Sequence, residues 1–223
     1  MFSSAIQRLN DRRHAAGEIG EDAGFTLIEL MVVLLILAIL LAIAIPTFLG
    51  VTKSANDRAA QSNLNTALVN AKAAYQSQGQ SYTSTSVTTS ALFAANLGTA
   101  EPALAFTTGN STGQGSVSVQ VSTTDGNGIV MAAFSKSNNC WYIIDNPTTV
   151  STTTNPPWTG TVVGTNGGTA VAGTGQAIVV PGTLGTIYAE VKGDSAKGDC
   201  SAASPVIGSG ASYQWSTTGF PSL

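Results

Sequence analysis

The sequence predicts an α+β protein in which a long N-terminal helix packs on an antiparallel β-sheet. Three observations support this prediction. Residues 25–49 form an apolar run with one charge, residues 53–78 continue in a helical pattern without proline, and the chain from about Ser81 onward is rich in Ser, Thr, Gly and Val. Apolar residues at helical spacing predict a helix, and alternating runs between turn residues predict strands. We therefore divide the chain into residues 1–24, a polar leader; 25–78, the helix; and 79–223, a β-rich head.

The apolar run is long enough to cross a membrane. About 20 apolar residues span the hydrocarbon core of a bilayer, and residues 25–49 supply them. Arg8, Arg12 and Arg13 precede the run, which predicts that the N-terminus stays in the cytoplasm and that the head is exported. An ordinary secretory signal peptide, cleaved near residues 42–44, is the alternative, although its apolar region normally has about 7–15 residues.

One carboxylate interrupts this run. Glu29 lies in its first turn, and an ionised side chain inside a bilayer is costly, so that it marks a functional site by default. Glu29 therefore needs a partner. A partner outside its own chain indicates assembly, whereas pairing with the amine of its own chain, or extension to the membrane surface, indicates a local role.

The junction Gly24-Phe25-Thr26-Leu27-Ile28-Glu29, followed by the unbroken apolar run, closely resembles that of the type IV pilin superfamily. The resemblance implies that a prepilin peptidase cuts after Gly24, that Phe25 becomes an N-methylated N-terminus, and that the apolar helix is retained. It also implies that Glu29 pairs with the N-terminal amine of a neighbouring subunit during assembly. Phe25 and Glu29 are separated by about 6 Å along a helix axis, which suits such pairing.

The resemblance also implies a localisation and a set of partners. The precursor is expected to be a single-pass protein of the cell membrane, and the processed chain to be part of an extracellular pilus in a helical filament of identical subunits. The other expected partners are the prepilin peptidase and the pilus assembly platform with its ATPase. Adhesion, motility or DNA uptake are the implied roles. A pseudopilin of a secretion or competence machine, and a membrane-tethered binding protein that never polymerises, are the alternatives.

The second half of the helix has an apolar stripe. Leu64, Leu68, Ala71 and Tyr75 recur at helical spacing, which predicts that this face packs on the head. The opposite face carries polar residues, namely Asn63, Asn65, Asn70 and Lys72. Gly79 is the expected stop. Pro46 lacks a backbone N–H, so we expect a bend there, and the family resemblance implies that the helix can extend at this point.

Several short runs in the head predict strands, and Gly- and Asn-rich turns separate them. The predicted strands are Ser116–Val121, Ile129–Ser135, Cys140–Ile144, Ala177–Val180, Thr186–Lys192 and Tyr213–Ser216. Residues 148–176 have low complexity and are predicted to be an exposed loop with one short strand, Thr161–Val163.

The chain has two cysteines, Cys140 and Cys200. Export permits a disulfide, and the family commonly ties its C-terminal region with one, so we expect these two to be joined. Two unpaired thiols are the alternative. The segments 140–145 and 198–202, and the ending at 215–221, most resemble pilins of Gram-positive, particularly actinobacterial, bacteria.

The remaining residues do not predict an enzyme. The one histidine, His14, lies in the leader, so the processed chain has no imidazole base or ligand, and we expect no cofactor and no resident metal. Convergence of Asp145, Glu190, Asp194 and Asp199 on calcium is a secondary hypothesis, and solvated loop positions are the simpler interpretation. Without residues 1–24 the chain keeps six Lys/Arg and eight Asp/Glu, which gives no direct signal for nucleic-acid binding.

Overall fold

The computed structural model of the chain describes residues 25–122, 126–148, 169–171, 176–177, 184–192, 200–203, 206–207 and 212–221. These residues fall into two compact units, the first ending at Leu49 and the second beginning at Gly50. A single helix, α2 (Leu27–Ser77), contributes to both units. Its apolar first half belongs to the first unit, and its amphipathic second half belongs to the second unit with the sheet.

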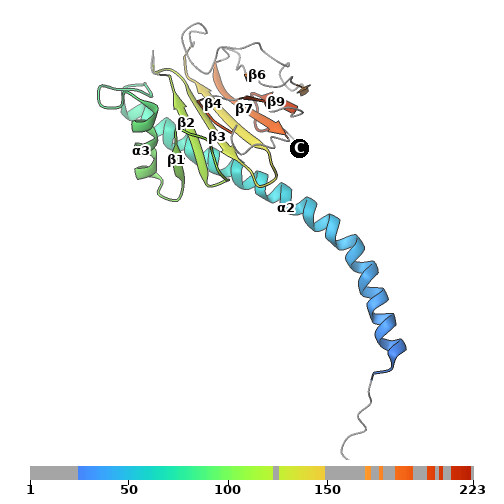
Figure 1. Cartoon of the computed structure of the whole chain (residues 1–223). Helices are drawn as coiled ribbons and strands as arrows, with labels where there is room; N and C mark the ends of the chain where they lie inside the picture. Colours follow the sequence, from blue (N-terminus) through green and yellow to red (C-terminus); the bar gives the residue numbers. More distant parts are fainter. Residues whose placement is uncertain are drawn as a thin grey trace, which may run out of the picture. The chain divides into compact units, whose positions relative to one another are not determined.

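The second unit contains the predicted α+β arrangement (Figure 1). A sheet has the strand order β1-β2-β3-β4-β7-β9-β5, and β6 and β8 form a separate pair. The bounds are β1 Ala105–Thr107, β2 Ser116–Val121, β3 Ile129–Phe134, β4 Cys140–Asn146, β5 Thr169–Val171, β6 Gln176–Ala177, β7 Gly185–Lys192, β8 Val206–Ile207 and β9 Ser212–Ser216. The described pairs are antiparallel except β1–β2, which is parallel, so the sheet is mostly antiparallel, in agreement with the predicted fold class.

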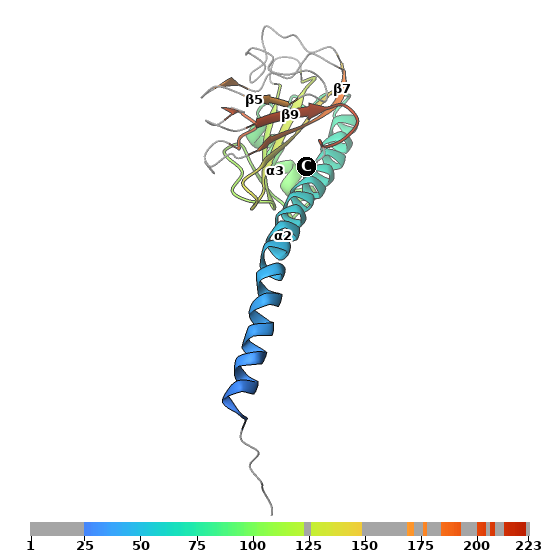
Figure 2. The same ribbon diagram turned by 90° about the vertical axis from the view of Figure 1, so that its right-hand side faces the viewer.

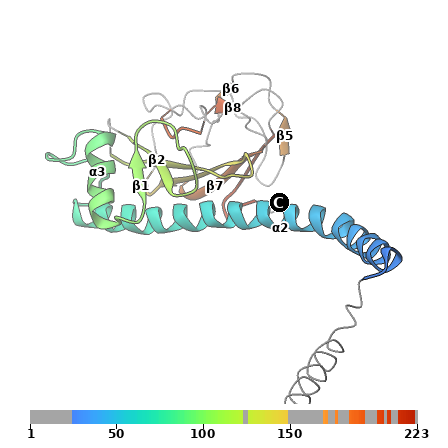
Figure 3. The same cartoon turned by 60° about the horizontal axis from the view of Figure 1, so that its bottom comes forward.

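The second half of α2 packs along one face of the sheet, as Figures 2 and 3 show from two further directions. Leu64, Leu68, Ala71 and Tyr75 are buried, which confirms the predicted stripe. They join inward-facing residues of β2, β3 and β4 in one core. The helix ends at Ser77, just before Gly79, whose positive φ of 77° is the conformation that favours glycine at a helix C-terminus.

The opposite face of the sheet has a core of its own. Alternate residues of β3, β4 and β7 are buried there together with Cys200 and Ala202. Every residue of β3 and β4 is consequently buried. A strand covered on both faces reads as a continuous apolar run rather than an alternating one, which accounts for the sequences of these two strands.

A second helix, α3 (Ser90–Ala100), was not predicted from the sequence. Thr89 is its N-cap, and its hydroxyl accepts a hydrogen bond from the Leu92 N–H at 3.3 Å. The helix buries Phe93, Ala94 and Leu97 against the core that it shares with α2 and the sheet. Its N-cap threonine was the available signal, because threonine is a favoured residue at that position.

The predicted strands are confirmed where the structure describes them, with small shifts at their ends. Strand β5 is a correction, since it lies inside the stretch that we predicted to be a loop, and β1 and β8 were also missed. The predicted strand Thr161–Val163 lies outside the described residues. A three-residue strand carries too few side chains for alternation to be visible in the sequence.

Candidate functional site

The first turn of α2 holds the Glu29 carboxylate in a reciprocal set of hydrogen bonds. Glu29 Oε2 accepts from the backbone N–H of Thr26 and from its hydroxyl, both at 2.9 Å. The Glu29 N–H donates back to Thr26 Oγ1 at 3.3 Å. This is a capping box, in which the N-cap residue and the residue three positions later satisfy each other's backbone donors. The carboxylate thus has partners within its own chain before any other molecule approaches.

Sequence reasoning singled out Glu29 but missed its partner Thr26. The pattern Thr26-x-x-Glu29 before an apolar run was the signal, because it is the sequence signature of a capping box. The predicted pairing with the N-terminal amine of a neighbouring subunit stays a prediction. Gly24 lies outside the described residues, and cleavage after it and methylation of Phe25 are also still predictions.

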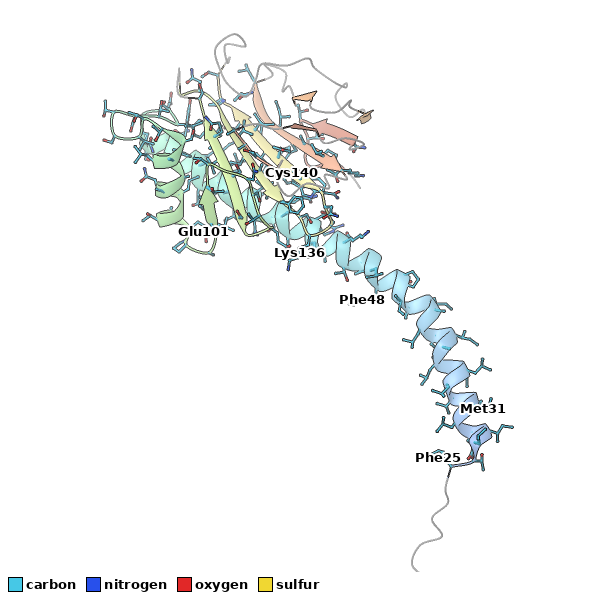
Figure 4. The ribbon with its side chains drawn as sticks, in the orientation of Figure 1. Phe25, Met31, Phe48, Glu101, Lys136 and Cys140 are labelled. Atoms are coloured by element: carbon cyan, nitrogen blue, oxygen red, sulfur yellow. A yellow bond between two sulfur atoms is a disulfide. The ribbon has the colours of Figure 1, made fainter. Side chains whose placement is uncertain are left out.

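The first unit presents an apolar surface that nothing in the described chain covers. The large apolar side chains from Phe25 to Leu49 are all substantially exposed, between 47% for Leu37 and 85% for Phe25. Figure 4 shows such side chains along this half of α2, with Phe25, Met31 and Phe48 labelled. Soluble proteins rarely expose apolar surface on this scale, and larger patches mark membrane or protein contacts.

Among the described residues, α2 is also the one helix that is long and apolar enough to cross a membrane, judged by length and composition. The burial of these side chains must therefore come from lipid or from other protein molecules. A helix that is apolar all round has no solvated face of its own. Its exposed surface is the candidate site of this protein.

Pro46 lies within α2 and does not interrupt it, since the helix is continuous from Leu27 to Ser77. Proline removes the hydrogen bond to the carbonyl four residues earlier. At the next position, the Thr47 hydroxyl donates to the Ile43 carbonyl at 3.0 Å, a local contact that accompanies bends in helices. The bend at Pro46 stays a prediction.

The disulfide between Cys140 and Cys200 is present, with a Cα–Cα distance of 5.5 Å, and confirms the expected pairing. It joins the start of β4 to the segment 200–203. Two hydrogen bonds hold the same segment, because Ser111 N–H donates to the Cys200 carbonyl at 2.8 Å and Ala202 N–H donates to Ser118 Oγ at 2.9 Å. A segment far along the chain is thereby fixed to the sheet.

Asp57 attaches α2 to the turn between β3 and β4. It is 2% exposed. Its carboxylate accepts hydrogen bonds from Ser137 Oγ, from Asn139 Nδ2 at 3.3 Å and from Trp141 Nε1 at 3.1 Å. A buried carboxylate is stable in this setting because several donors replace the water that it has lost. Sequence reasoning missed this contact, because the donors lie about 80 residues away along the chain.

Glu190 lies near this contact and is less well satisfied. It is fully buried, it is the cross-strand neighbour of Trp141, and neither carboxylate oxygen has a hydrogen-bond partner. Lys192 Nζ lies 3.8 Å from Oε2. The pKa of Glu190 is raised to about 7, chiefly by burial; the Lys192 ammonium lowers it in part, and the charge of Asp57 adds to the rise.

The calcium hypothesis finds no support among the described residues. Asp145 accepts from Tyr82 Oη at 2.6 Å, Thr186 Oγ1 at 2.7 Å and Lys72 Nζ at 3.0 Å, so donors already occupy its oxygens. Burial and the Asp145 carboxylate raise the pKa of Tyr82, which keeps this donor protonated. Asp194 and Asp199 lie outside the described residues, and the described residues hold no group of three potential ligands among His, Cys, Asp and Glu.

These features define a class of protein. Residues 21–45 match the family model of the prokaryotic N-terminal methylation motif. This match includes the predicted cleavage junction, the capping box and most of the exposed apolar helix. The motif, the long apolar helix and the α+β fold together resemble those of type IV pilins.

A curated relative points the same way. The chain is 49% identical over 61 residues to a protein of Thermus thermophilus described as "Type IV wide pilus major component PilA4". The similarity covers 27% of this chain and 46% of the relative, so the chain spans less than half of the relative's length. No solved structure matches the chain significantly. The narrower resemblance to actinobacterial pilins stays a prediction.

Proposed function

We propose that the chain is a structural subunit of an extracellular type IV pilus filament, with no catalytic role. It is exported as a prepilin, cleaved after Gly24 and methylated on Phe25. The observation that carries the proposal is the apolar surface of residues 25–49, exposed along the whole run. Lipid buries that surface in the precursor, and the same segment of other subunits buries it in the filament.

In this proposal, Glu29 aligns the apolar helices of neighbouring subunits. In the proposed assembly step, the carboxylate exchanges its contacts with Thr26 for the methylated amine of an incoming subunit. An opposite charge in a poorly solvated setting binds a carboxylate more strongly than a hydroxyl does. The amine of the next subunit is thus placed at a fixed height along the apolar helix, which sets the stagger between subunits.

The partners follow from this route. The precursor lies in the cytoplasmic membrane, is cut by a prepilin peptidase, and is moved into the filament by an assembly platform with its ATPase. A pilus that displays its heads serves adhesion, motility or DNA uptake. The disulfide that fixes residues 200–203 to the sheet suits a surface displayed outside the cell, where disulfides persist.

N-terminal sequencing of the sheared extracellular protein tests the processing step. We expect the sequence to begin at Phe25 and the first residue to carry one methyl group. A start near Ile45 would instead identify an ordinary signal peptide and remove the apolar helix from the mature protein.

Substitution of Glu29 tests the assembly step. We expect Glu29→Ala to leave export and membrane insertion intact and to abolish sheared filaments, because the charge that positions the incoming amine is gone. Glu101→Ala, which removes a carboxylate from the second unit, is the matched control and should leave filaments normal. Normal filaments from Glu29→Ala would refute the assembly role.

A further inference from the structure

In the second unit, the described acidic residues and the described basic residues differ in how far they are buried. Its described acids are buried, apart from the half-buried Glu101. Two described cations, Lys72 and Lys192, lie beside such acids. The other three, Lys53, Arg58 and Lys136, are exposed and form no ion pair with any described residue. The described surface is therefore positive there, although the chain as a whole is acidic.

These three cations surround one turn of α2. Lys53 precedes Asp57 by four residues, so the two share a face of the helix. Arg58 directly follows Asp57. Lys136 is placed at the same level, because its neighbour Ser137 donates a hydrogen bond to the Asp57 carboxylate. Figure 4 labels Lys136 where the β3–β4 turn meets α2.

This turn follows closely on the apolar segment. Lys53 is four residues after Leu49, the last residue of the apolar run. Four residues span at most about 14 Å even when fully extended. If residues 25–49 lie in a bilayer, Lys53 cannot leave the region of the lipid headgroups, and the next turn of the helix follows directly.

We propose that Lys53, Arg58 and Lys136 form a basic surface that binds the phosphate groups of anionic lipids while the precursor waits in the membrane. Basic residues next to a membrane segment are attracted to anionic headgroups within about a Debye length. Continuity with the apolar segment selects lipid over other polyanions. The inference rests on the membrane-anchored precursor proposed above, and it adds a lipid preference that assembly must overcome when the subunit leaves the membrane.

Hydrogen exchange on the full chain in lipid nanodiscs tests the proposal. One set of discs contains phosphatidylcholine alone, and the other contains an added fraction of phosphatidylglycerol. At low salt we expect exchange of the β3–β4 turn amides, residues 135–139, to slow by roughly fivefold in the anionic discs. High salt should abolish the difference, since it screens exposed charges.

Two triple variants separate charge from packing. Lys53→Gln/Arg58→Gln/Lys136→Gln should exchange equally in both kinds of disc. Lys53→Arg/Arg58→Lys/Lys136→Arg keeps the charges and should retain the protection. Unchanged exchange of the β3 and β4 strand amides verifies that each variant is folded.

The possible outcomes test the membrane-anchored precursor and the lipid-binding surface separately. Failure of the chain to insert into neutral discs would remove the membrane anchor and with it the proposed precursor. If the chain inserts but its hydrogen exchange does not depend on lipid charge, only the proposed lipid-binding surface is overturned. Stronger protection of the turn by added duplex DNA than by phosphatidylglycerol would also overturn it, and would assign the surface to nucleic acid.

Discussion

Replacing Glu190 with glutamine should stabilise the head at alkaline pH. The folded state holds the pKa of Glu190 at about 7, against an ordinary value of 4.5. Each unit of difference corresponds to about 1.36 kcal/mol, so the full shift is worth on the order of 3 kcal/mol. Because the pKa is raised on folding, the folded state binds a proton that the unfolded state releases.

The direction of the pKa shift determines the pH range in which the stability changes. Below about pH 4.5 both states are protonated, and the residue adds no pH dependence to the free energy of unfolding. Between about pH 4.5 and pH 7 that free energy falls, and above about pH 7 the loss is complete. Glutamine keeps the shape of the side chain and cannot ionise. The variant should therefore match the wild type near pH 4.5 and exceed it at pH 8.

Thermal unfolding of the full chain in detergent, followed by circular dichroism between pH 4.5 and pH 8.5, measures this difference. For a domain of this size, about 3 kcal/mol corresponds to a rise of roughly 6–12 °C in melting temperature. Glu101→Gln makes the same chemical change at a half-buried position and should follow the wild-type curve. Equal melting temperatures of Glu190→Gln and wild type at pH 8 would refute a buried carboxylate without a hydrogen-bond partner.

Three further predictions concern the second unit. Asp57→Ala should lower the free energy of unfolding by on the order of 3 kcal/mol in urea titrations, because three donors lose their acceptor; a loss below about 1 kcal/mol would contradict this. Cys140→Ser/Cys200→Ser should lower the free energy of unfolding by about 4 kcal/mol, because the bond closes a loop of 60 residues. The oxidised wild type should migrate faster than the reduced protein on electrophoresis, and equal mobility would argue against the bond. Gly126→Ala should lower the free energy of unfolding by about 1–3 kcal/mol in thermal unfolding, since φ is +66° and a Cβ would lie 2.0 Å from Ser81 Oγ. Gly113→Ala is the control, because a Cβ there would meet open space. Equal stability of the two variants would refute the close approach at Gly126.

Local patterns predicted the elements with long, regular signals. The stripe through Leu64, Leu68, Ala71 and Tyr75 places the helix face correctly, because a helix repeats its contacts every turn. The predicted runs at 116–121 and 186–192 likewise match β2 and β7 closely. Thr26 was also readable, since its partner Glu29 lies three residues away in the same turn.

Contacts between distant residues were not readable in this way. The Asp57 carboxylate meets donors from the β3–β4 turn, and nothing in the residues around position 57 indicates which strand will pass there. The short strands β1 and β5 form because their neighbours offer an edge, and their own sequences carry little signal.

The sequence by itself determined that the chain has an apolar helix of membrane-spanning length with a carboxylate in its first turn, and that this segment matches the start of a type IV pilin. Composition and spacing along one helix are enough for that, because both can be read from neighbouring residues of the chain. Only the tertiary structure decided which acids are buried and which cations are left outside. Burial and hydrogen bonding depend on residues that come together after folding, and the fate of a charge follows from its surroundings rather than from its place in the chain.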